Sequence, residues 1–241
     1  YEPGRSMGTF GEDCAAKYGF TRAEQDAFAT ASVERAKAAT ASGAFAAEIT
    51  PVTVKSRAGE TVVSVDEGPG KVKLDKIASL KPAFKKDGTI TAASSSSIND
   101  GAAALVMMRA STATKLGCKP LARIVGHATH AQEPEWFATA PLGATQKALA
   151  KAGWAVGDVD LWEINEAFAV VPMALMKELN LPHDKVNVNG GACALGHPIG
   201  ASGARIMVTL IYALQARGLT KGLATLCIGG GEATAVAVEL V

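Results

Sequence analysis

The glycine-rich segment at residues 186–204, VNVNGGACALGHPIGASGA, constrains the fold more than any other part of the chain. An apolar start runs into paired glycines, and His197 stands between a glycine and Pro198 shortly before the apolar run at residues 205–218. Glycine allows positive φ and a close backbone approach to a ligand, whereas proline suits the first turn of a helix. The pattern predicts a strand at 186–188, a tight loop and then a helix, with His197 at or just before the helix N-terminus.

The position of His197 points to chemistry as well as to a turn. The positive end of a helix dipole disfavours the imidazolium form. A neutral imidazole beside unpaired backbone N–H groups can accept a proton or help to stabilise an oxyanion. The alternative is a hydrogen-bonded histidine in a tight turn, which is the more common situation for a single histidine. Two further segments favour the chemical interpretation, WEINEAF at 162–168 and TLCIGGG at 225–231.

Three blocks together carry a family resemblance: NEAF at 165–168, GHPIGASGAR at 196–205 and CIGGG at 227–231. In this order and spacing they resemble the C-terminal half of the thiolase family, the acetyl-CoA acetyltransferases. The resemblance continues upstream through MGTFGEDCAAKYGFTRAEQDAFA, LKPAF and INDGAAAL. It implies an α/β, thiolase-like layered fold, with a C-terminal βαβαβαββ half-domain and part of the helical loop domain.

Composition excludes several other classes of protein. Of the 241 residues, 48% are hydrophobic and 20% charged, as in ordinary globular proteins. A formal net charge of +1 gives no electrostatic reason for a nucleic-acid or membrane partner, and no apolar run approaches the ~18–20 residues of a membrane span. Four cysteines without a CxxC pair argue against a disulfide framework or structural zinc. We therefore expect a cytoplasmic protein without metal or cofactor.

The start of the chain predicts a fragment. It opens with YEPG, without an initiator methionine or a targeting sequence. In the family the matching MG lies well inside the protein, and the half before it carries the acyl-accepting cysteine in a CGSG loop, a motif that this sequence lacks. We expect a C-terminal part without the N-terminal half. Its divisions would be residues 1–97 from the loop domain on the CoA-binding side, residues 98–120 packing against the absent half, and residues 121–241 as the C-terminal domain.

Local patterns predict the secondary structure. Residues 8–46 are expected to form two helices separated at 18–20, with a capping box from Thr21 to Glu24. Alternating apolar residues predict two strands within 49–65. Further helices are expected at 112–117, 141–153, 168–179 and after Ser202, and further strands at 105–108 (buried), 122–129, 159–164, 186–188, 223–228 and 233–240, with a hairpin at 229–231.

Residues 66–76 are predicted to form a polar loop. Lys71, Lys73 and Lys76 on it either form a solvated surface, the favoured interpretation, or face the phosphates of a nucleotide. The serine run at 91–97 has the composition of a linker, but structured sequence is expected on both sides of it.

The resemblance implies a role for each catalytic candidate. His197 would activate the missing acyl-accepting cysteine and help to hold the thioester oxygen, while Asn165 would orient a water in the same oxyanion site. Cys227 would remove and return the α-proton of acetyl-CoA, as the cysteine whose thiol is activated beside a CoA-shaped cleft. The Gly229 N–H would serve a second oxyanion site. Simpler alternatives are a helix N-cap for Asn165 and a small buried apolar residue for Cys227.

The resemblance also implies a site for coenzyme A. Ser96 best matches a CoA-contacting serine, and Ala92, Met7 and Phe168 would line the same pantetheine channel. The expected partners are acyl-CoA, the N-terminal thiolase half and, in the complete protein, further copies in a dimer or tetramer.

The expected reaction is condensation of two acetyl-CoA to acetoacetyl-CoA and CoA, or the reverse thiolysis. The alternatives are a 3-ketoacyl-CoA thiolase for longer chains and an inactive CoA-binding or structural fragment. Hydrolysis by a Cys227–His197 pair is conceivable, but the shape of the motif matches the condensing family. A nucleotide enzyme is disfavoured, because GHPIGASG lacks the GK[ST] of a P-loop and no GxGxxG follows a strand.

Overall fold

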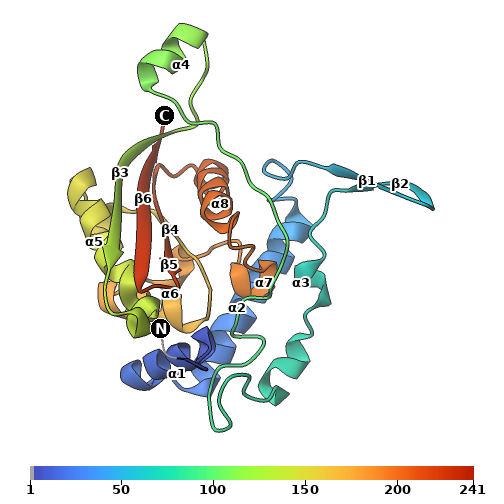
Figure 1. Ribbon diagram of the computed structural model, residues 1–241. Helices are drawn as coiled ribbons and strands as arrows, with labels where there is room; N and C mark the ends of the chain where they lie inside the picture. The colour runs from blue at the N-terminus through green and yellow to red at the C-terminus, as the bar shows by residue number, and fades with distance from the viewer. Residues whose placement is uncertain (1–2) are drawn as a thin grey trace.

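A mixed four-stranded sheet is the centre of the molecule in the computed structural model, which describes residues 3–241 (Figure 1). The strand order is β3-β6-β5-β4, with β6 antiparallel to both β3 and β5 and with β4 parallel to β5. The strands are β3 (Ala122–Ala131), β4 (Leu161–Ile164), β5 (Lys221–Ile228) and β6 (Glu232–Leu240). The predicted hairpin at 229–231 is confirmed as the connection between β5 and β6.

Helices cover both faces of this sheet. Figure 1 shows α5 on one side and α8 on the other. Alternation along β4 explains the two cores, because Trp162 and Ile164 pack with the apolar residues of α5 while Leu161 packs with those of α8. The helices and 3₁₀ helices of this part are η2 (Pro134–Thr139), α5 (Ala140–Ala152), η3 (Val156–Asp158), α6 (Val170–Leu179), η4 (His183–Lys185), α7 (Ala192–Leu195) and α8 (Ser202–Arg217). The α/β layered prediction is therefore confirmed.

The strand predicted at 186–188 is wrong, so the half-domain contains one strand fewer than βαβαβαββ. Val186 makes a single parallel bridge to Trp162. Asn187 then adopts a positive φ of 47°. Its side chain accepts from the Ile164 N–H and donates to the Ile164 carbonyl, both at 2.8 Å. Because this amide takes the place of a backbone partner, the strand ends where it was expected to begin.

The N-terminal part consists of two long helices and a projecting hairpin. The helices are α1 (Met7–Tyr18) and α2 (Arg22–Ser42), as predicted, and the Thr21–Glu24 capping box is present. The hairpin of β1 (Val52–Ser56) and β2 (Gly59–Val63) is exposed along its whole length and extends away from the body (Figure 1). The predicted loop at 66–76 is partly wrong, because it contains α3 (Gly68–Lys71) and the start of η1 (Leu74–Ser79).

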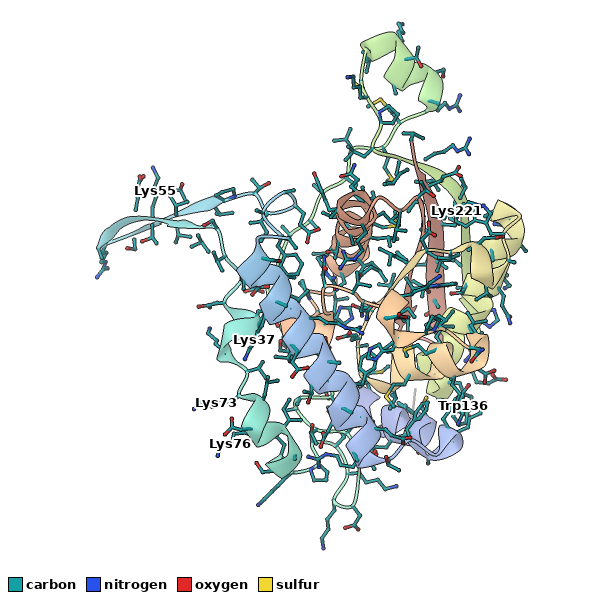
Figure 2. The ribbon with its side chains drawn as sticks, turned by 180° about the vertical axis from the view of Figure 1, so that it is seen from behind. Lys37, Lys55, Lys73, Lys76, Trp136 and Lys221 are labelled. Carbon is teal, nitrogen blue, oxygen red and sulfur yellow. The ribbon has the colours of Figure 1, made fainter. Side chains whose placement is uncertain are left out.

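The lysines of this segment lie on the outside of the molecule. Lys71 pairs with Glu67 and Lys76 with Asp75, and all four side chains are well exposed. Figure 2 shows Lys73 and Lys76 along the same outer edge as Lys37 of α2, whose ammonium donates to the Val72 carbonyl. These contacts fit the solvated-surface interpretation.

Residues 98–109 cross the molecule as an extended segment that leads to α4 (Ala110–Leu116). The buried strand predicted at 105–108 is wrong, because no strand forms there within the described residues. Val106 and Met107 are 89% and 70% exposed. An apolar run forms a strand only when a neighbouring backbone satisfies its N–H and C=O groups, and the described chain supplies no such neighbour at this segment.

Candidate active site

His197 and Asn165 meet where the end of β4 faces the loop before α8. Asn165 follows β4, and its N–H donates to the Thr225 carbonyl of β5. This contact aims the side chain toward the loop, where Asn165 Nδ2 lies 3.3 Å from His197 Nε2. Asn165 is not a helix N-cap, because the next helix begins only at Val170. That structural alternative for Asn165 is therefore wrong.

Hydrogen bonds on both sides of the imidazole define its tautomer. Asn165 Nδ2 can only donate, so Nε2 must accept. On the other side, His197 Nδ1 lies 2.5 Å from Ser202 Oγ, and this hydroxyl donates in turn to the Pro198 carbonyl at 3.0 Å. The arrangement therefore assigns the proton to Nδ1 and a lone pair to Nε2. Pro198 was expected in the first turn of the helix, but it lies in the turn before α8.

The pKa of His197 is lowered, as expected, but the helix dipole is not the main cause. Burial lowers the pKa first, and the positive charge of Arg205 lowers it further. His197 lies five residues before the first residue of α8, Ser202, and is therefore linked to this helix through a side chain rather than by its position at the terminus. The result is a neutral imidazole that can accept a proton at Nε2.

The serine run is ordered against both catalytic blocks and is no flexible linker. Ser96 donates through its backbone N–H and its Oγ to the Ala167 carbonyl, at 3.1 and 3.0 Å. The Ser97 carbonyl accepts from the His197 N–H at 3.1 Å. Gly196 has a φ of +83°, and a Cβ there would clash with the side-chain amide of Asn99. Residues 96–99 thus lie between the NEAF segment at 165–168 and the loop that carries His197.

Glu166 links the NEAF segment to the loop before α8 through buried hydrogen bonds, a role that the sequence interpretation missed. Its buried carboxylate accepts from Ser32 Oγ at 2.7 Å, from Asn187 Nδ2 at 2.8 Å and from the Cys193 N–H at 2.9 Å. Gly191 passes so close that a Cβ would lie 2.3 Å from Glu166 Cδ. Three partners from distant parts of the chain could not be found from local patterns.

Cys227 is not an activated thiol in this chain. It lies at the end of β5 in an apolar cluster with Phe10, Cys14 and Phe168, and it is 6% exposed. Burial raises its pKa to about 12. The thiolate is the reactive form of cysteine, so the expectation of an activated Cys227 does not hold for the chain by itself.

The residues predicted to line the pantetheine channel differ in their surroundings. Met7 lies beside the β5–β6 turn, since a Cβ added to Gly229 would be 3.7 Å from Met7 Cε. Phe168 forms a backbone bridge with Ser95 but points its ring into the core, edge-on to two other phenylalanines. Ala92 is exposed, at a bend near the start of the serine run. A cavity of about 210 Å³ lies elsewhere, between α1 and residues 85–89.

Cysteine labelling tests the state of Cys227. We expect iodoacetamide at neutral pH to modify Cys118, which is exposed, at least about 100-fold faster than Cys227. Burial also raises the pKa of Cys14 to about 12 and that of Cys193 well above its usual value. Peptide mass spectrometry over time measures the four rates. Labelling of Cys227 before Cys118 would contradict the buried, protonated thiol described above.

Two negative findings concern the residues that the structure describes. Across residues 3–241, no helix combines the length and the hydropathy that a membrane span requires. In the same part of the chain, histidine, cysteine and acidic side chains form no group of three or more able to hold a metal ion.

A neutral histidine held by the asparagine of an NEAF segment therefore lies at the edge of a four-stranded α/β layer. Residues 118–240 match the family model described as "Thiolase, C-terminal domain", and residues 2–111 match "Thiolase, N-terminal domain". The chain therefore belongs to the thiolase family. It carries sequence from both domains, so the expectation of a C-terminal part alone was wrong. The predicted boundaries after residues 97 and 120 remain predictions, and residues 1–2 lie outside the described part.

Several of the similar proteins are named acetyl-CoA acetyltransferase. An acetyl-CoA acetyltransferase of Chromobacterium violaceum is 55% identical over 235 residues, which are 97% of this chain and 60% of the relative. The crystal structure of the Bacillus anthracis acetyl-CoA acetyltransferase superposes with a TM-score of 0.95 at 47% identity, covering 98% of this chain and 60% of that one. Human mitochondrial 3-ketoacyl-CoA thiolase superposes with a TM-score of 0.90 at 37% identity, with the same coverage. The chain thus spans about 60% of the length of these proteins.

Proposed function

We propose that this chain forms the histidine-bearing part of an acetyl-CoA C-acetyltransferase. The reaction is the condensation of two acetyl-CoA to acetoacetyl-CoA and CoA, or the reverse thiolysis. The observation that carries the proposal is the Asn165–His197 contact, which leaves a neutral imidazole with its Nε2 lone pair toward the asparagine. The name acetyl-CoA acetyltransferase, printed for the Chromobacterium violaceum and Bacillus anthracis proteins, supports the choice of acetyl-CoA as substrate.

His197 acts as the general base in this proposal. Nε2 takes the proton of the attacking thiol, and the resulting thiolate forms a bond to the carbonyl carbon of the thioester. The C–S bond of the thioester then breaks, and the departing thiolate takes up the proton held on His197. The acyl-accepting cysteine of the CGSG loop is not among the 241 residues. Asn165 orients a water at the oxyanion site, and its Oδ1, buried without a hydrogen-bond partner in the described chain, is free for this task. Cys227 exchanges the α-proton once the complete site lowers its pKa, and the Gly229 N–H serves the second oxyanion site.

Coenzyme A lies along the serine run in the same proposal. Ser96 contacts it, with Ala92 and Met7 at the pantetheine channel and Phe168 as the buried support beneath. The contacts of Ser96 with NEAF and of Ser97 with His197 favour this route, because they bring the run to the catalytic pair. The remaining thiolase sequence and further copies of the protein, in a dimer or tetramer, are the proposed partners. A cytoplasmic location remains a prediction.

The test is to complete the chain. The portion of the Chromobacterium violaceum relative that this chain does not cover is joined to the chain, and acetoacetyl-CoA cleavage is followed by loss of its enolate absorbance. We expect thiolysis that falls by about 10²–10⁴-fold in His197→Ala and stays unchanged in His127→Ala, an exposed histidine of β3. Faster cleavage of a longer 3-ketoacyl-CoA would favour the longer-chain alternative. A folded joined protein without thiolysis would favour an inactive CoA-binding fragment.

A further inference from the structure

Ser202 connects the imidazole of His197 to the rest of the fold. It is the first residue of α8 and is 1% exposed. Its Oγ lies 2.5 Å from His197 Nδ1 and donates to the Pro198 carbonyl at 3.0 Å. The same carbonyl accepts from the backbone N–H groups of Ala201 at 2.8 Å and of Ser202 at 2.9 Å. Three hydrogen bonds therefore hold this carbonyl in the turn, and the hydroxyl has a fixed acceptor.

Helix capping does not explain this serine. A serine at the start of a helix usually accepts a hydrogen bond from a backbone N–H of the first turn. The N-cap of α8 is Ala201, and no side-chain cap hydrogen bond forms at this helix end within the described residues. The Ser202 hydroxyl instead makes its two hydrogen bonds to the imidazole and to Pro198. Its contacts are therefore directed to the histidine and not to the end of the helix.

The directions of these hydrogen bonds leave one arrangement for the ring. A hydroxyl has a single proton, and Ser202 donates its proton to Pro198, so toward the imidazole Oγ can only accept. His197 must then carry its proton on Nδ1. On the other side of the ring, Asn165 Nδ2 lies 3.3 Å from Nε2. Asn165 alone would not secure this arrangement, because its amide can turn and present its unpartnered Oδ1 to a protonated Nε2.

We propose that Ser202 is a positioning residue whose hydroxyl fixes the proton of His197 on Nδ1 and holds the ring with Nε2 toward Asn165. Nε2 rather than Nδ1 is then the nitrogen that accepts the proton of the attacking thiol, so the catalytic consequence rests on the proposed function. When Nε2 takes up that proton, the hydrogen bond from Nδ1 to Oγ is kept and becomes charge-assisted, which makes it stronger. Ser202 acts through the imidazole and not on the substrate.

Nitrogen NMR of the histidine rings in the 241-residue chain tests the proposal without any activity, because the chemical shift of a ring nitrogen depends on whether it is protonated. Spectra are recorded at mildly alkaline pH, where the imidazole is neutral, and the signals of His197 are assigned by their loss in His197→Gln. We expect the wild-type ring to be protonated on Nδ1. Ser202→Ala is expected to shift the ratio of the two tautomers toward Nε2–H by about 10-fold or more, since the buried Nδ1–H loses its acceptor.

Two further variants separate the hydroxyl from other effects of substitution. Ser202→Thr keeps the hydroxyl and is expected to keep the Nδ1 tautomer. Thr209→Val removes another buried hydroxyl of α8, one that donates to Glu48, and is also expected to leave the tautomer unchanged. In the joined protein, Ser202→Ala should lower kcat for acetoacetyl-CoA cleavage by about 10–100-fold and change KM by no more than about twofold, and Ser202→Thr should restore most of the rate.

The outcomes separate this proposal from the enzymatic one. An unchanged tautomer in a folded Ser202→Ala would overturn the role of Ser202, and so would a wild-type ring protonated on Nε2. If Ser202→Ala fails to fold, Ser202→Cys keeps nearly the same volume with a sulfur that is only a weak acceptor, and an unchanged tautomer there has the same meaning. A joined protein that does not cleave acetoacetyl-CoA would disprove the proposed function, whereas the tautomer shift in the 241-residue chain would remain.

Discussion

The 241-residue chain by itself is expected to cleave acetoacetyl-CoA no faster than a buffer that contains free CoA. The proposed reaction passes through an acyl group held on a cysteine thiolate, and the CGSG loop that would carry this cysteine is not in the sequence. Without a covalent nucleophile, the reaction must pass through one difficult step instead of two easier ones. Rates should therefore fall by at least about 10³-fold against the joined protein.

None of the four cysteines is placed to act as a substitute. Burial raises the pKa values of Cys14, Cys193 and Cys227, which therefore remain thiols at neutral pH. Cys118 is exposed and follows α4, in a part of the chain that Figure 1 shows well away from α7 and the start of α8. His197 is present and neutral, but it has no thiol to activate.

The measurement is loss of enolate absorbance with the chain alone, with His197→Ala as its background. Equal rates for the two proteins are the expected result. Robust cleavage that disappears in His197→Ala, with a single chain detected by intact mass, would mean that one of the four cysteines is the nucleophile. The assignment of roles proposed above would then be wrong.

Sequence signals that act over a few residues were sufficient to predict much of the secondary structure. The capping box at Thr21 and the glycines at 229–231 act within a few residues of the structure that they specify, and both predictions are confirmed. The predicted strands at 105–108 and 186–188 failed for another reason. The first is an apolar run and the second has a valine on each side of Asn187. A strand also needs a backbone partner: the first has none within the described chain, and the second loses its partner to the side chain of Asn187.

In the candidate site, too, local patterns identify some residues, whereas others depend on partners distant in the sequence. Asn165 and His197 stand in recognisable motifs, and the structure brings them together. Ser202 could have been anticipated as a hydroxyl at the start of a helix near His197. Glu166 could not, because its partners come from segments more than a hundred residues apart in sequence.

Replacing Glu166 by alanine is expected to destabilise the chain by about 3–5 kcal/mol. The change leaves Ser32, Asn187 and the Cys193 N–H without their acceptor in a buried setting, and each unsatisfied donor costs about 1–3 kcal/mol before relaxation. Glu166 is fully buried, so water cannot easily take over. Glu166→Gln keeps the volume and one acceptor oxygen, and we expect it to cost about 1–2 kcal/mol.

Urea unfolding followed by tryptophan fluorescence measures these differences, because Trp162 is buried on β4 next to the network. The matched control is Glu67→Ala, which removes an exposed glutamate paired with Lys71 and should cost no more than about 0.5 kcal/mol. The network also holds the loop that carries His197, since it ties Cys193 to the NEAF segment. Glu166→Ala should therefore weaken the Asn165–His197 contact even in the folded fraction. An unfolding midpoint equal to that of Glu67→Ala would mean that the buried carboxylate contributes no net stability and that packing alone holds the two blocks together.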